Sequence, residues 1–259
     1  MKKVKKLILP VAGRGSRLKP LTNHRPKALL KISEKALIDY VLEEAKLAGI
    51  KEIILIVRPS QKKKFQAHLN KKIFSEFKFF YREQEKLLGN GHSILMAEDL
   101  IANEPVAVRF PDDLLIGKNN QSSSLRQAIE IFQSQKSPIL MLKKVPQKDV
   151  FRYGIVKLKN KNLNIKEIND IVEKPDTSKA PSNLAVLGLY ILTPQIIKYL
   201  KDLSASIPEI DDALPLTSAL KMHLEKNGKI FGIEVSENHF DCGNMEGFLK
   251  ARNFLAKKL

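Results

Sequence analysis

The sequence predicts an α/β fold in which a mostly parallel sheet is flanked by helices on both faces. Short apolar runs that suit buried strands alternate along the first half of the chain with segments whose apolar residues recur at helical spacing. Strands and helices in alternation are typical of a parallel sheet covered by helices. The chain has 259 residues, 43% of them apolar, which is enough for one sizeable core. It contains no internal repeat and no linker rich in Pro, Gly or Ser, so we expect a single domain over residues 1–259.

The first half of the chain supplies most of the alternating elements. Leu7–Val11 is predicted as a short buried strand that ends at a glycine-rich turn. The helix over Ala36–Ala48 has apolar side chains at helical spacing and is stopped by Gly49. The remaining strands of this half are Lys51–Val57, Phe77–Arg82, Pro105–Phe110 and Pro138–Lys143, and its remaining helices are Gln61–Leu69, Ser93–Leu100 and Ser123–Ser134.

The second half begins with two strands, Gly154–Lys157 and Ile168–Glu173, which we expect to pair across the polar hairpin KNKNLN at 159–164. A helix over Ala213–Lys226 follows an irregular entry. The other expected elements are strands over Ala185–Leu192 and Ile230–Val235 and helices over Pro194–Leu200 and Asn244–Ala256. This order favours one domain that carries a long insertion.

Composition excludes several classes of protein. No apolar run approaches the ~20 residues needed to span a bilayer, and the basic residues 1–6 precede an apolar run too short for a signal peptide. The single cysteine, Cys242, cannot form an internal disulfide, so we expect a cytoplasmic protein. A net charge of +17 first suggests nucleic-acid binding. The lysines are scattered, however, and form no arginine stripe with aromatic residues, so we favour general solubility and expect no specific nucleic-acid partner.

The stretch 7–31 combines a buried strand, a glycine-rich turn and a run of cations. Gly13 and Gly15 have no Cβ, so the backbone N–H groups of the turn can approach a phosphate closely. Arg17 and Lys27 add full positive charge at the same place. The turn matches neither the Walker A loop nor the dinucleotide fingerprint. The combination fits a triphosphate cradle, and the glycines alone leave an ordinary tight turn as the alternative.

Two carboxylates are expected at the carboxyl edge of the sheet, where open α/β sheets bind their ligands. Asp112 ends the strand predicted over 105–110, and Asp241 lies just past the strand predicted over 230–235. Because Mg²⁺ takes one or two carboxylates together with substrate phosphate oxygens, both residues are candidate ligands of Mg²⁺. The alternative is that Asp112 caps a turn and Asp241 caps the last helix.

Three further polar residues have side chains that suit a sugar phosphate or a base. Glu173 can accept hydrogen bonds from adjacent sugar hydroxyls, and the neighbouring Lys174 can hold a phosphate. Gln84 carries both a donor and an acceptor, so it can read the edge of a base. The alternatives are a surface charge pair before a proline and an ordinary turn residue. His24, His92 and His239 have no metal-ligand spacing with one another or with Cys242, so we expect all three to be structural or solvent-facing.

Several of these motifs occur together in an order that is known from one family. They are GRGSR (13–17) with PK (26–27), PD (111–112), YG (153–154), VEKP (172–175), SNLAVLGLYIL (182–192) and DCGN (241–244). In this order the chain resembles the bacterial UDP-glucose pyrophosphorylases, the UTP–glucose-1-phosphate uridylyltransferase branch of the sugar nucleotidyltransferase superfamily. The resemblance implies a Rossmann-like sheet with a sugar-binding insertion, which is the nucleotide-diphospho-sugar transferase fold. It also implies a Mg²⁺-dependent reaction in which UTP and glucose 1-phosphate give UDP-glucose and pyrophosphate.

The same resemblance implies a role for each candidate residue. Arg17 would hold the departing pyrophosphate, and Lys27 would lie over the reacting α-phosphate, as the two catalytic residues. The nucleotide would be bound by Ala12, Gly13, Gly15, Gln84 and Gly89, of which the last two would read uracil. The sugar would face Gly154, Glu173 and Val186, its phosphate would face Lys174, and Mg²⁺ would be held by Asp112 and Asp241. Residues 1–150 would be mainly the nucleotide-binding half, and residues 151–259 mainly the sugar-binding half with the last helix.

Three departures from the family pattern leave the exact substrates open. Ser16 stands where the family has threonine, although the hydroxyl is kept. Ala28 and Leu29 follow Lys27 where an acidic residue is usual, and the segment 209–216 is longer than usual. The alternatives are therefore the same chemistry with dTDP-glucose or GDP-mannose as product, or a sugar-nucleotide-binding relative without catalysis. Because members of the family commonly self-associate, the resemblance also implies a homodimer or homotetramer.

Overall fold

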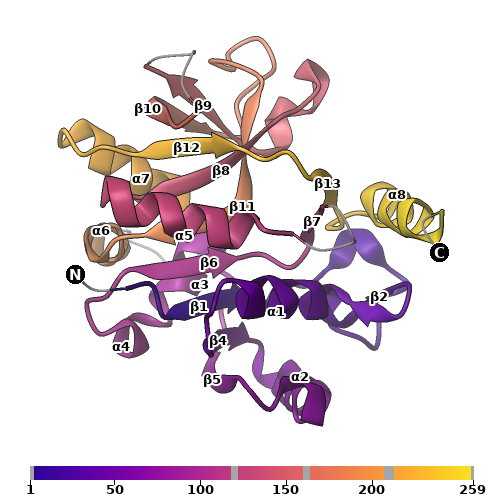
Figure 1. The fold of residues 1–259 in the computed structure, drawn as a ribbon. Coiled ribbons are helices and arrows are strands. Elements are labelled where there is room, and N and C mark those ends of the chain that lie inside the picture. The colour runs from indigo at the N-terminus through magenta and orange to yellow at the C-terminus, as the bar shows by residue number, and fades with distance from the viewer. Residues whose placement is uncertain (1–2, 118–121, 160–163, 207–212, 258–259) are drawn as a thin grey trace.

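A nine-stranded sheet runs through the middle of the computed structural model, which describes residues 3–117, 122–159, 164–206 and 213–257 (Figure 1). The strands lie in the order β5-β4-β1-β6-β11-β8-β12-β10-β9. Their bounds are β1 Lys6–Pro10, β4 Glu52–Val57, β5 Lys78–Glu83, β6 Val106–Arg109, β8 Ile139–Lys144, β9 Gly154–Leu158, β10 Lys166–Glu173, β11 Leu184–Leu192 and β12 Phe231–Glu234.

The directions of these strands confirm the predicted fold class. β1 pairs in parallel with β4 and β6, β4 pairs in parallel with β5, and β12 pairs in parallel with β8. Two strands run the other way: β11 is antiparallel to β6 and β8, between which it is inserted, and β10 is antiparallel to β12 and β9. The predicted pairing of the strands near 154 and 168 is therefore confirmed, while hairpin residues 160–163 lie outside the described residues.

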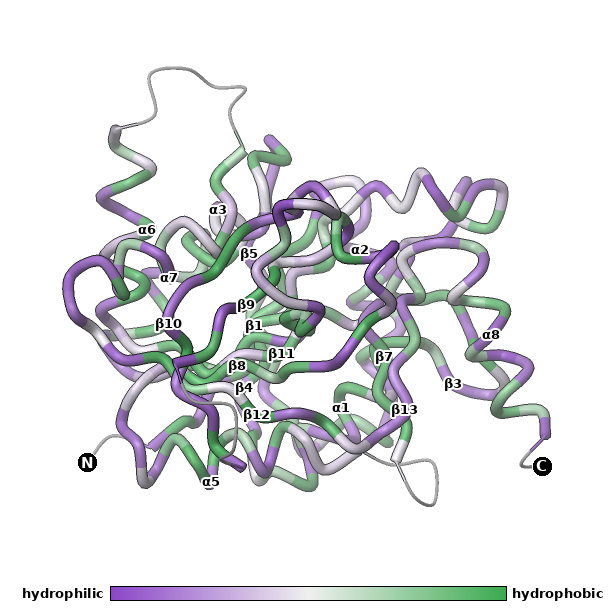
Figure 2. The backbone as a smooth tube through the Cα atoms, turned by 90° about the horizontal axis from the view of Figure 1, so that it is seen from above, coloured by the Kyte–Doolittle hydropathy of each residue, from purple (hydrophilic) through white to green (hydrophobic). Residues whose placement is uncertain are grey.

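Helices cover both faces of the sheet, as predicted. Successive side chains of a strand point to opposite faces, so Leu7 and Leu9 of β1 pack into one apolar core and Ile8 packs into the other. Figure 2 shows the green, hydrophobic strands with α1 and α5 on one side and α3 and α6 on the other. The first core receives side chains from α1 (Leu37–Leu47), α2 (Pro59–Leu69) and α5 (Ser124–Gln135), and the second from α3 (Gly89–Leu95), α4 (Glu98–Ile101), α6 (Pro194–Ser206) and α7 (Leu216–Glu225).

Two predicted helices differ from the observed ones. The single helix predicted over 93–100 is wrong, because α3 already begins at Gly89 and ends at Leu95, and α4 begins only at Glu98. The glycine-rich start of α3 is held by the later chain, since Gly91 N–H donates to Leu214 O at 2.9 Å. The helix predicted from 213 begins at Leu216, after Pro215, and residues 209–212 of the longer segment lie outside the described residues.

A small two-stranded sheet beside the main one was not predicted. β7 (Asp113–Ile116) pairs antiparallel with β13 (Asn238–Asp241), so Asp113 lies opposite Asp241. The last helix, α8 (Met245–Ala256), follows β13 directly, and a second short pair, β2 (Lys31–Ile32) with β3 (Lys35–Ala36), precedes α1. The pairing of β7 with β13 brings two segments that are far apart in the sequence to one end of the main sheet (Figure 1).

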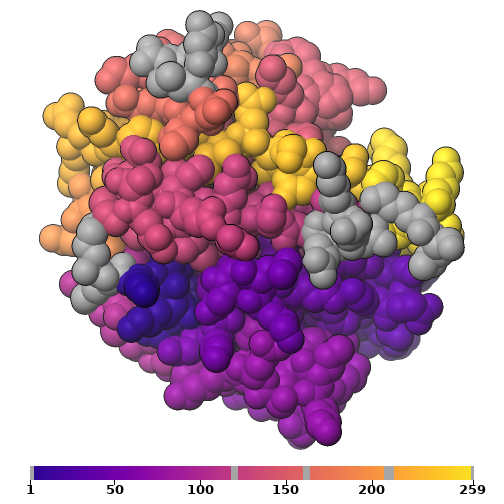
Figure 3. Space-filling model, viewed as in Figure 1, coloured from indigo at the N-terminus to yellow at the C-terminus, as the bar shows by residue number. Residues whose placement is uncertain are grey.

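The two halves of the chain share the main sheet. In Figure 3 the indigo and purple residues of the N-terminal part form the lower region of this face, and the later residues form the upper region. β8 of the first half lies among strands of the second half, between β11 and β12. Within the described residues, none of the helices has both the length and the apolar character needed to cross a membrane.

Candidate active site

Two cavities meet beyond the carboxyl ends of β1, β5 and β6. The first has a volume of about 270 Å³, the second has a volume of about 410 Å³, and Asn90, Phe110 and Asp112 line both. The first is lined by Ala12, Gly13, Lys27, Gln84 and Gly89 among the candidate residues. The second is lined by Arg17, Gly154, Glu173, Lys174, Val186 and Asp241. The structure therefore gathers four of the five predicted nucleotide residues around one cavity and the predicted sugar residues around the other.

Gly15 is the candidate residue that lines neither cavity, and its role is to shape the turn. Its φ of +65° lies in the left-handed region, and a Cβ at this position would come within 2.9 Å of Thr22 Cγ2. Thr22 also closes the turn, because its hydroxyl donates to Gly15 O at 2.9 Å. Short 3-10 segments at Ser16–Leu18 and Lys27–Leu29 then direct Arg17 and Lys27 toward the cavities.

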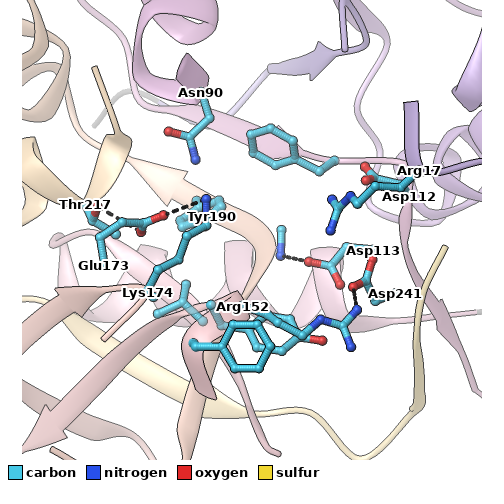
Figure 4. A pocket seen from close by; sticks show the side chains of 16 residues that line it. Arg17, Asn90, Asp112, Asp113, Arg152, Glu173, Lys174, Tyr190, Thr217 and Asp241 are labelled. Carbon is cyan, nitrogen blue, oxygen red and sulfur yellow. Dashed lines mark hydrogen bonds and ion pairs between the residues drawn. The ribbon is translucent and has the colours of Figure 1, made fainter. Parts of the chain in front are cut away.

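The carboxylates of Asp112, Asp113 and Asp241 lie at one side of the second cavity, opposite Glu173 and Lys174 (Figure 4). A Cβ placed on Gly243 would lie 2.8 Å from Asp241 Oδ1 and 3.0 Å from Asp112 Oδ2. The carboxylates of Asp112 and Asp241 therefore face the same small space, and Arg17 Nη2 lies 3.5 Å from that point. The absence of a side chain at Gly243 keeps this space open.

Each of these two carboxylates has a cationic partner. Lys27 Nζ lies 2.5 Å from Asp112 Oδ2, and both side chains are about one-fifth exposed. Asp241 forms an ion pair with Arg152 and also accepts hydrogen bonds from Gly243 N at 2.9 Å and Asn244 Nδ2 at 3.0 Å. Burial opposes the charge on Arg152, but the adjacent Tyr153 and Asp241 outweigh that effect and raise the pKa of the guanidinium. Cations thus alternate with carboxylates along the cavity wall.

The donor set fits a hard divalent cation that shares its coordination with a substrate. Among the described residues there is no cluster of three or more His, Cys, Asp or Glu side chains that could enclose a metal ion. Asp112 and Asp241 offer two carboxylates to one space, which matches the preference of Mg²⁺ for one or two carboxylates plus phosphate oxygens.

Asp113 has a different role from Asp112 although it lines the same cavity. Its carboxylate binds His239 and accepts a hydrogen bond from Gly188 N at 2.5 Å, so it ties β7 to β11 and β13. Burial raises the pKa of Asp113, but the charges of His239 and Arg109 and the hydrogen bonds from His239 and Gly188 N outweigh burial, so its pKa is lowered. His239, for which the sequence shows no metal-ligand spacing, is therefore the partner of the structural carboxylate of Asp113.

The sugar side of the second cavity is built at strand ends. Glu173 ends β10, and its Oε2 accepts a hydrogen bond from Thr217 Oγ1 at 3.1 Å, while Lys174 Nζ lies 3.5 Å from Oε1. Lys174 lines the cavity and its side chain is 62% exposed, so its ammonium is accessible to a phosphate there. Gly154 leaves room for this pair, because a Cβ there would lie 3.1 Å from Thr217 Cγ2.

The base side of the first cavity is built around Gln84, which follows β5. Its backbone N–H donates to Val57 O at 2.8 Å, and its side chain is only 3% exposed. Gly89 has a φ of +92°, and a Cβ there would lie 2.7 Å from Leu214 O. Asn90 lines both cavities. Its Oδ1 accepts a hydrogen bond from Leu216 N at 2.7 Å, which fixes its side chain. Hydrogen bonds therefore run from Asn90 to Leu216 and, from the next residue, Thr217, to Glu173.

Sequence reasoning missed several residues that line the cavities. Arg152 is the most important, and a cation directly before the YG motif was its only signal. Asn90 lies between two glycines of a turn, where no pattern separates it from an ordinary turn residue. Thr217 faces Glu173 only because α7 packs against β10, which no local pattern predicts.

Comparisons with known proteins extend over the whole chain. The family model described as Nucleotidyl transferase matches residues 5–258. The UTP–glucose-1-phosphate uridylyltransferase of Pseudomonas aeruginosa is 31% identical over 277 residues, which cover 99% of this chain and 97% of that protein. A solved structure of UDP-glucose pyrophosphorylase complexed with UDP-glucose has a TM-score of 0.88 at 34% identity and covers 99% of this chain and 100% of that chain. The UTP-bound UGPase from Acinetobacter baumannii has a TM-score of 0.83 at 30% identity, with coverage of 99% and 94%.

Proposed function

The chain belongs to the nucleotidyl transferase family, and we propose that it is an enzyme that joins UTP to glucose 1-phosphate, giving UDP-glucose and pyrophosphate. The observation that carries this proposal is the meeting of two cavities at Asp112. One offers glycine backbone and Gln84 to a nucleotide, and the other offers Glu173 and Lys174 to a sugar phosphate. Uridylyltransferases and UDP-glucose pyrophosphorylases among its relatives favour UTP and glucose 1-phosphate over the thymidylyl and guanylyl alternatives.

The reaction needs positioning and charge neutralisation more than covalent chemistry. A phosphate oxygen of glucose 1-phosphate attacks the α-phosphorus of UTP in line, and the bond from that phosphorus to the bridging oxygen of the β-phosphate breaks. Pyrophosphate leaves with the bonding electron pair. The attacking oxygen is already an anion, so no general base is required, which agrees with the structural roles of the histidines near the site.

Each charged residue has a defined task in this proposal. Lys27 stabilises the charge on the α-phosphate, and Arg17 holds the pyrophosphate as it leaves. Glu173 accepts from sugar hydroxyls, Lys174 holds the sugar phosphate, and Gly154 and Val186 form the wall against the sugar. Asp112 and Asp241 would hold Mg²⁺, which would supply positive charge to the phosphate oxygens when bound.

Pyrophosphate release over a grid of four nucleoside triphosphates and four sugar 1-phosphates tests the proposal. We expect release with UTP and glucose 1-phosphate in the presence of Mg²⁺. Release with dTTP or GTP instead would keep the fold and mechanism but show that residues 26–30, in which Ala28 and Leu29 follow Lys27, report the base. The absence of release in every combination would overturn the enzymatic function.

We further propose that the chain acts as one domain in the cytoplasm and as a homodimer or homotetramer. Support for the single domain comes from the main sheet, which contains strands from both 1–150 and 151–259. Light scattering of the purified protein gives the molar mass, and a monomeric mass at micromolar concentration would contradict the proposed self-association.

A further inference from the structure

The side chain of Gln84 has a partner that lies outside the cavity. Gln84 Nε2 lies 2.9 Å from His92 Nδ1, and His92 belongs to α3. Gln84 lines the first cavity, whereas His92 lines neither of the two cavities. His92 therefore stands behind Gln84 and can reach a bound base only through the Gln84 amide.

The chemistry of this contact fixes two hydrogen positions. An amide nitrogen is a donor and never an acceptor, so His92 Nδ1 must be the acceptor and the proton of the neutral ring must be on Nε2. Burial lowers the pKa of His92, which keeps the ring in this neutral form at neutral pH. In the tautomer with its proton on Nε2, the ring presents an acceptor at Nδ1, and the nitrogen end of the Gln84 amide is the end that can pair with it.

We propose that His92 is a positioning residue that fixes the direction of the Gln84 amide and so makes the site select uracil over cytosine. With Nε2 committed to His92, the amide keeps Oε1 and its second N–H for the base. Uracil has an N–H at ring position 3 beside a carbonyl, and these groups match that acceptor and that donor. Cytosine has an acceptor at position 3 beside an amino group, so each of its groups would meet a like group. This inference rests on the proposed binding of UTP in the first cavity.

A neighbouring residue provides the contrast. Ser93 lines the same cavity and is 4% exposed, and its hydroxyl has no hydrogen-bond partner among the described residues. A hydroxyl can both donate and accept, so it suits a carbonyl and an amino group equally. Ser93 can add affinity for either pyrimidine, whereas discrimination falls to the oriented amide of Gln84.

The first experiment measures both the dissociation constants and kcat/KM for UTP and CTP in variants at position 92. His92→Phe removes the acceptor and frees the amide to rotate. We therefore expect the preference for UTP over CTP, measured as the ratio of affinities and as the ratio of kcat/KM values, to fall by about tenfold or more. His92→Asn offers an acceptor again through its Oδ1, and we expect it to recover part of the preference for UTP. Ser93→Ala is the matched control and should weaken UTP and CTP by the same factor.

The outcomes separate this inference from the proposed function. Wild-type turnover of UTP together with an unchanged UTP to CTP ratio in His92→Phe would overturn the role of His92 and leave the function intact. Failure of the wild type to bind either nucleotide would overturn both. If His92→Phe does not fold, the tautomer of His92 in the wild type decides, by nitrogen-15 NMR of the imidazole. The Nε2-protonated ring is the expected result, and a proton on Nδ1 would overturn the inference.

Discussion

At the scale of single residues, Asp112 is where the two substrates would meet. It lines both cavities, and its carboxylate is held by Lys27 at 2.5 Å. A phosphate that binds beside this pair would add negative charge next to Asp112. The Lys27 ammonium would then interact with two anions, the carboxylate and the phosphate. Its contribution is therefore expected to be largest when the transferring phosphate carries most charge.

Replacement of Lys27 by Met tests this expectation, because it removes the ammonium and keeps the length of the side chain. We expect kcat for pyrophosphate release to fall by about 100-fold or more, as when a group that stabilises transition-state charge is lost. The dissociation constant for UTP should change far less. Lys63→Met, on an exposed side chain of α2, is the matched control and should behave like wild type. Equal losses in kcat and in affinity would show that Lys27 is only a binding group.

Asp112 and Asp113 are adjacent, but we expect their substitution to alter different properties: the Mg²⁺ requirement for Asp112 and the stability for Asp113. Asp112→Asn removes one of two carboxylates that face the space beside Gly243. We expect the Mg²⁺ concentration for half-maximal rate to rise by about tenfold or more, as is typical when a metal site loses a charged group. A Mg²⁺ titration of pyrophosphate release measures this shift. An unchanged Mg²⁺ requirement would show that Asp112 is not a ligand.

Asp113→Asn should instead alter stability and its dependence on pH. The folded-state pKa of Asp113 is lowered, so its ion pair contributes stability above the ordinary Asp value of 3.8 and loses it as the pH falls through the folded value. We expect the variant to be less stable than wild type at neutral pH and to lose less stability on acidification. Urea unfolding at a series of pH values measures both effects, and parallel curves for the two proteins would contradict this assignment.

How far single residues could be predicted depends on whether they belong to a local motif. Arg17, Lys27 and Glu173 stand in short motifs with recognisable chemistry, and the structure places all three at the cavities. Arg152 and Thr217 reach the second cavity because distant segments pack together, so their position depends on tertiary structure. No local spacing in the sequence carries that information.

At the scale of elements, the link between α1 and β6 is a fully buried ion pair. The Arg109 guanidinium binds the Glu44 carboxylate through two hydrogen bonds of 3.1 and 3.0 Å, and the two side chains are 0% and 2% exposed. Arg109 Nη1 also donates to Phe110 O at 3.0 Å and to Asp113 O at 2.6 Å. The pair therefore holds the turn that carries Asp112 against α1.

Breaking this pair from one side should be much worse than replacing both partners. Glu44→Gln leaves the buried Arg109 charge without a counter-charge, and we expect the free energy of unfolding to fall by about 3–5 kcal/mol. The double variant Glu44→Leu with Arg109→Met removes both charges. Its free energy of unfolding should fall by less than the sum of the falls caused by the two single changes. Urea unfolding of Glu44→Leu, of Arg109→Met and of the double variant measures the difference. Additive losses would show that the two side chains do not stabilise each other.

The main elements were predictable where a periodic apolar pattern decides them. β4 and β5 begin and end within one residue of the predicted strands, because each coincides with a short apolar run, mostly buried in β4 and half-buried in β5. β7 and β13 are only four residues long, and each exists through its pairing with the other. That pairing joins positions more than one hundred residues apart, so neither strand has a signal of its own.

At the scale of the whole molecule, the order of the strands is the feature that the sequence did not contain. Alternation of strands and helices predicts a parallel sheet, but it does not tell that β11 enters between β6 and β8 in the opposite direction. That insertion is a consequence of packing, since every side chain of β11 is buried between the two cores. It also brings Val186 and Gly188 to the second cavity.

The net charge of +17 is also a property of the whole molecule. Scattered lysines attract polyanions through counterion release, which weakens steeply as salt rises. We expect binding to random duplex DNA to be detectable in low salt and to be lost at physiological ionic strength. Fluorescence anisotropy over a salt series measures this. Affinity that survives physiological salt would revive a nucleic-acid function.

The shared wall of the two cavities has a practical consequence for inhibitor design. Asn90, Phe110 and Asp112 line both cavities, so a fragment in one cavity and a fragment in the other would contact the same three residues. A weak pyrimidine fragment and a weak sugar-like fragment could be joined by a short tether past Phe110. The second fragment would then bind intramolecularly, and joining two such modules commonly improves affinity by roughly 10²–10⁴-fold without a new contact. Screening could therefore begin with fragments too weak to be useful alone.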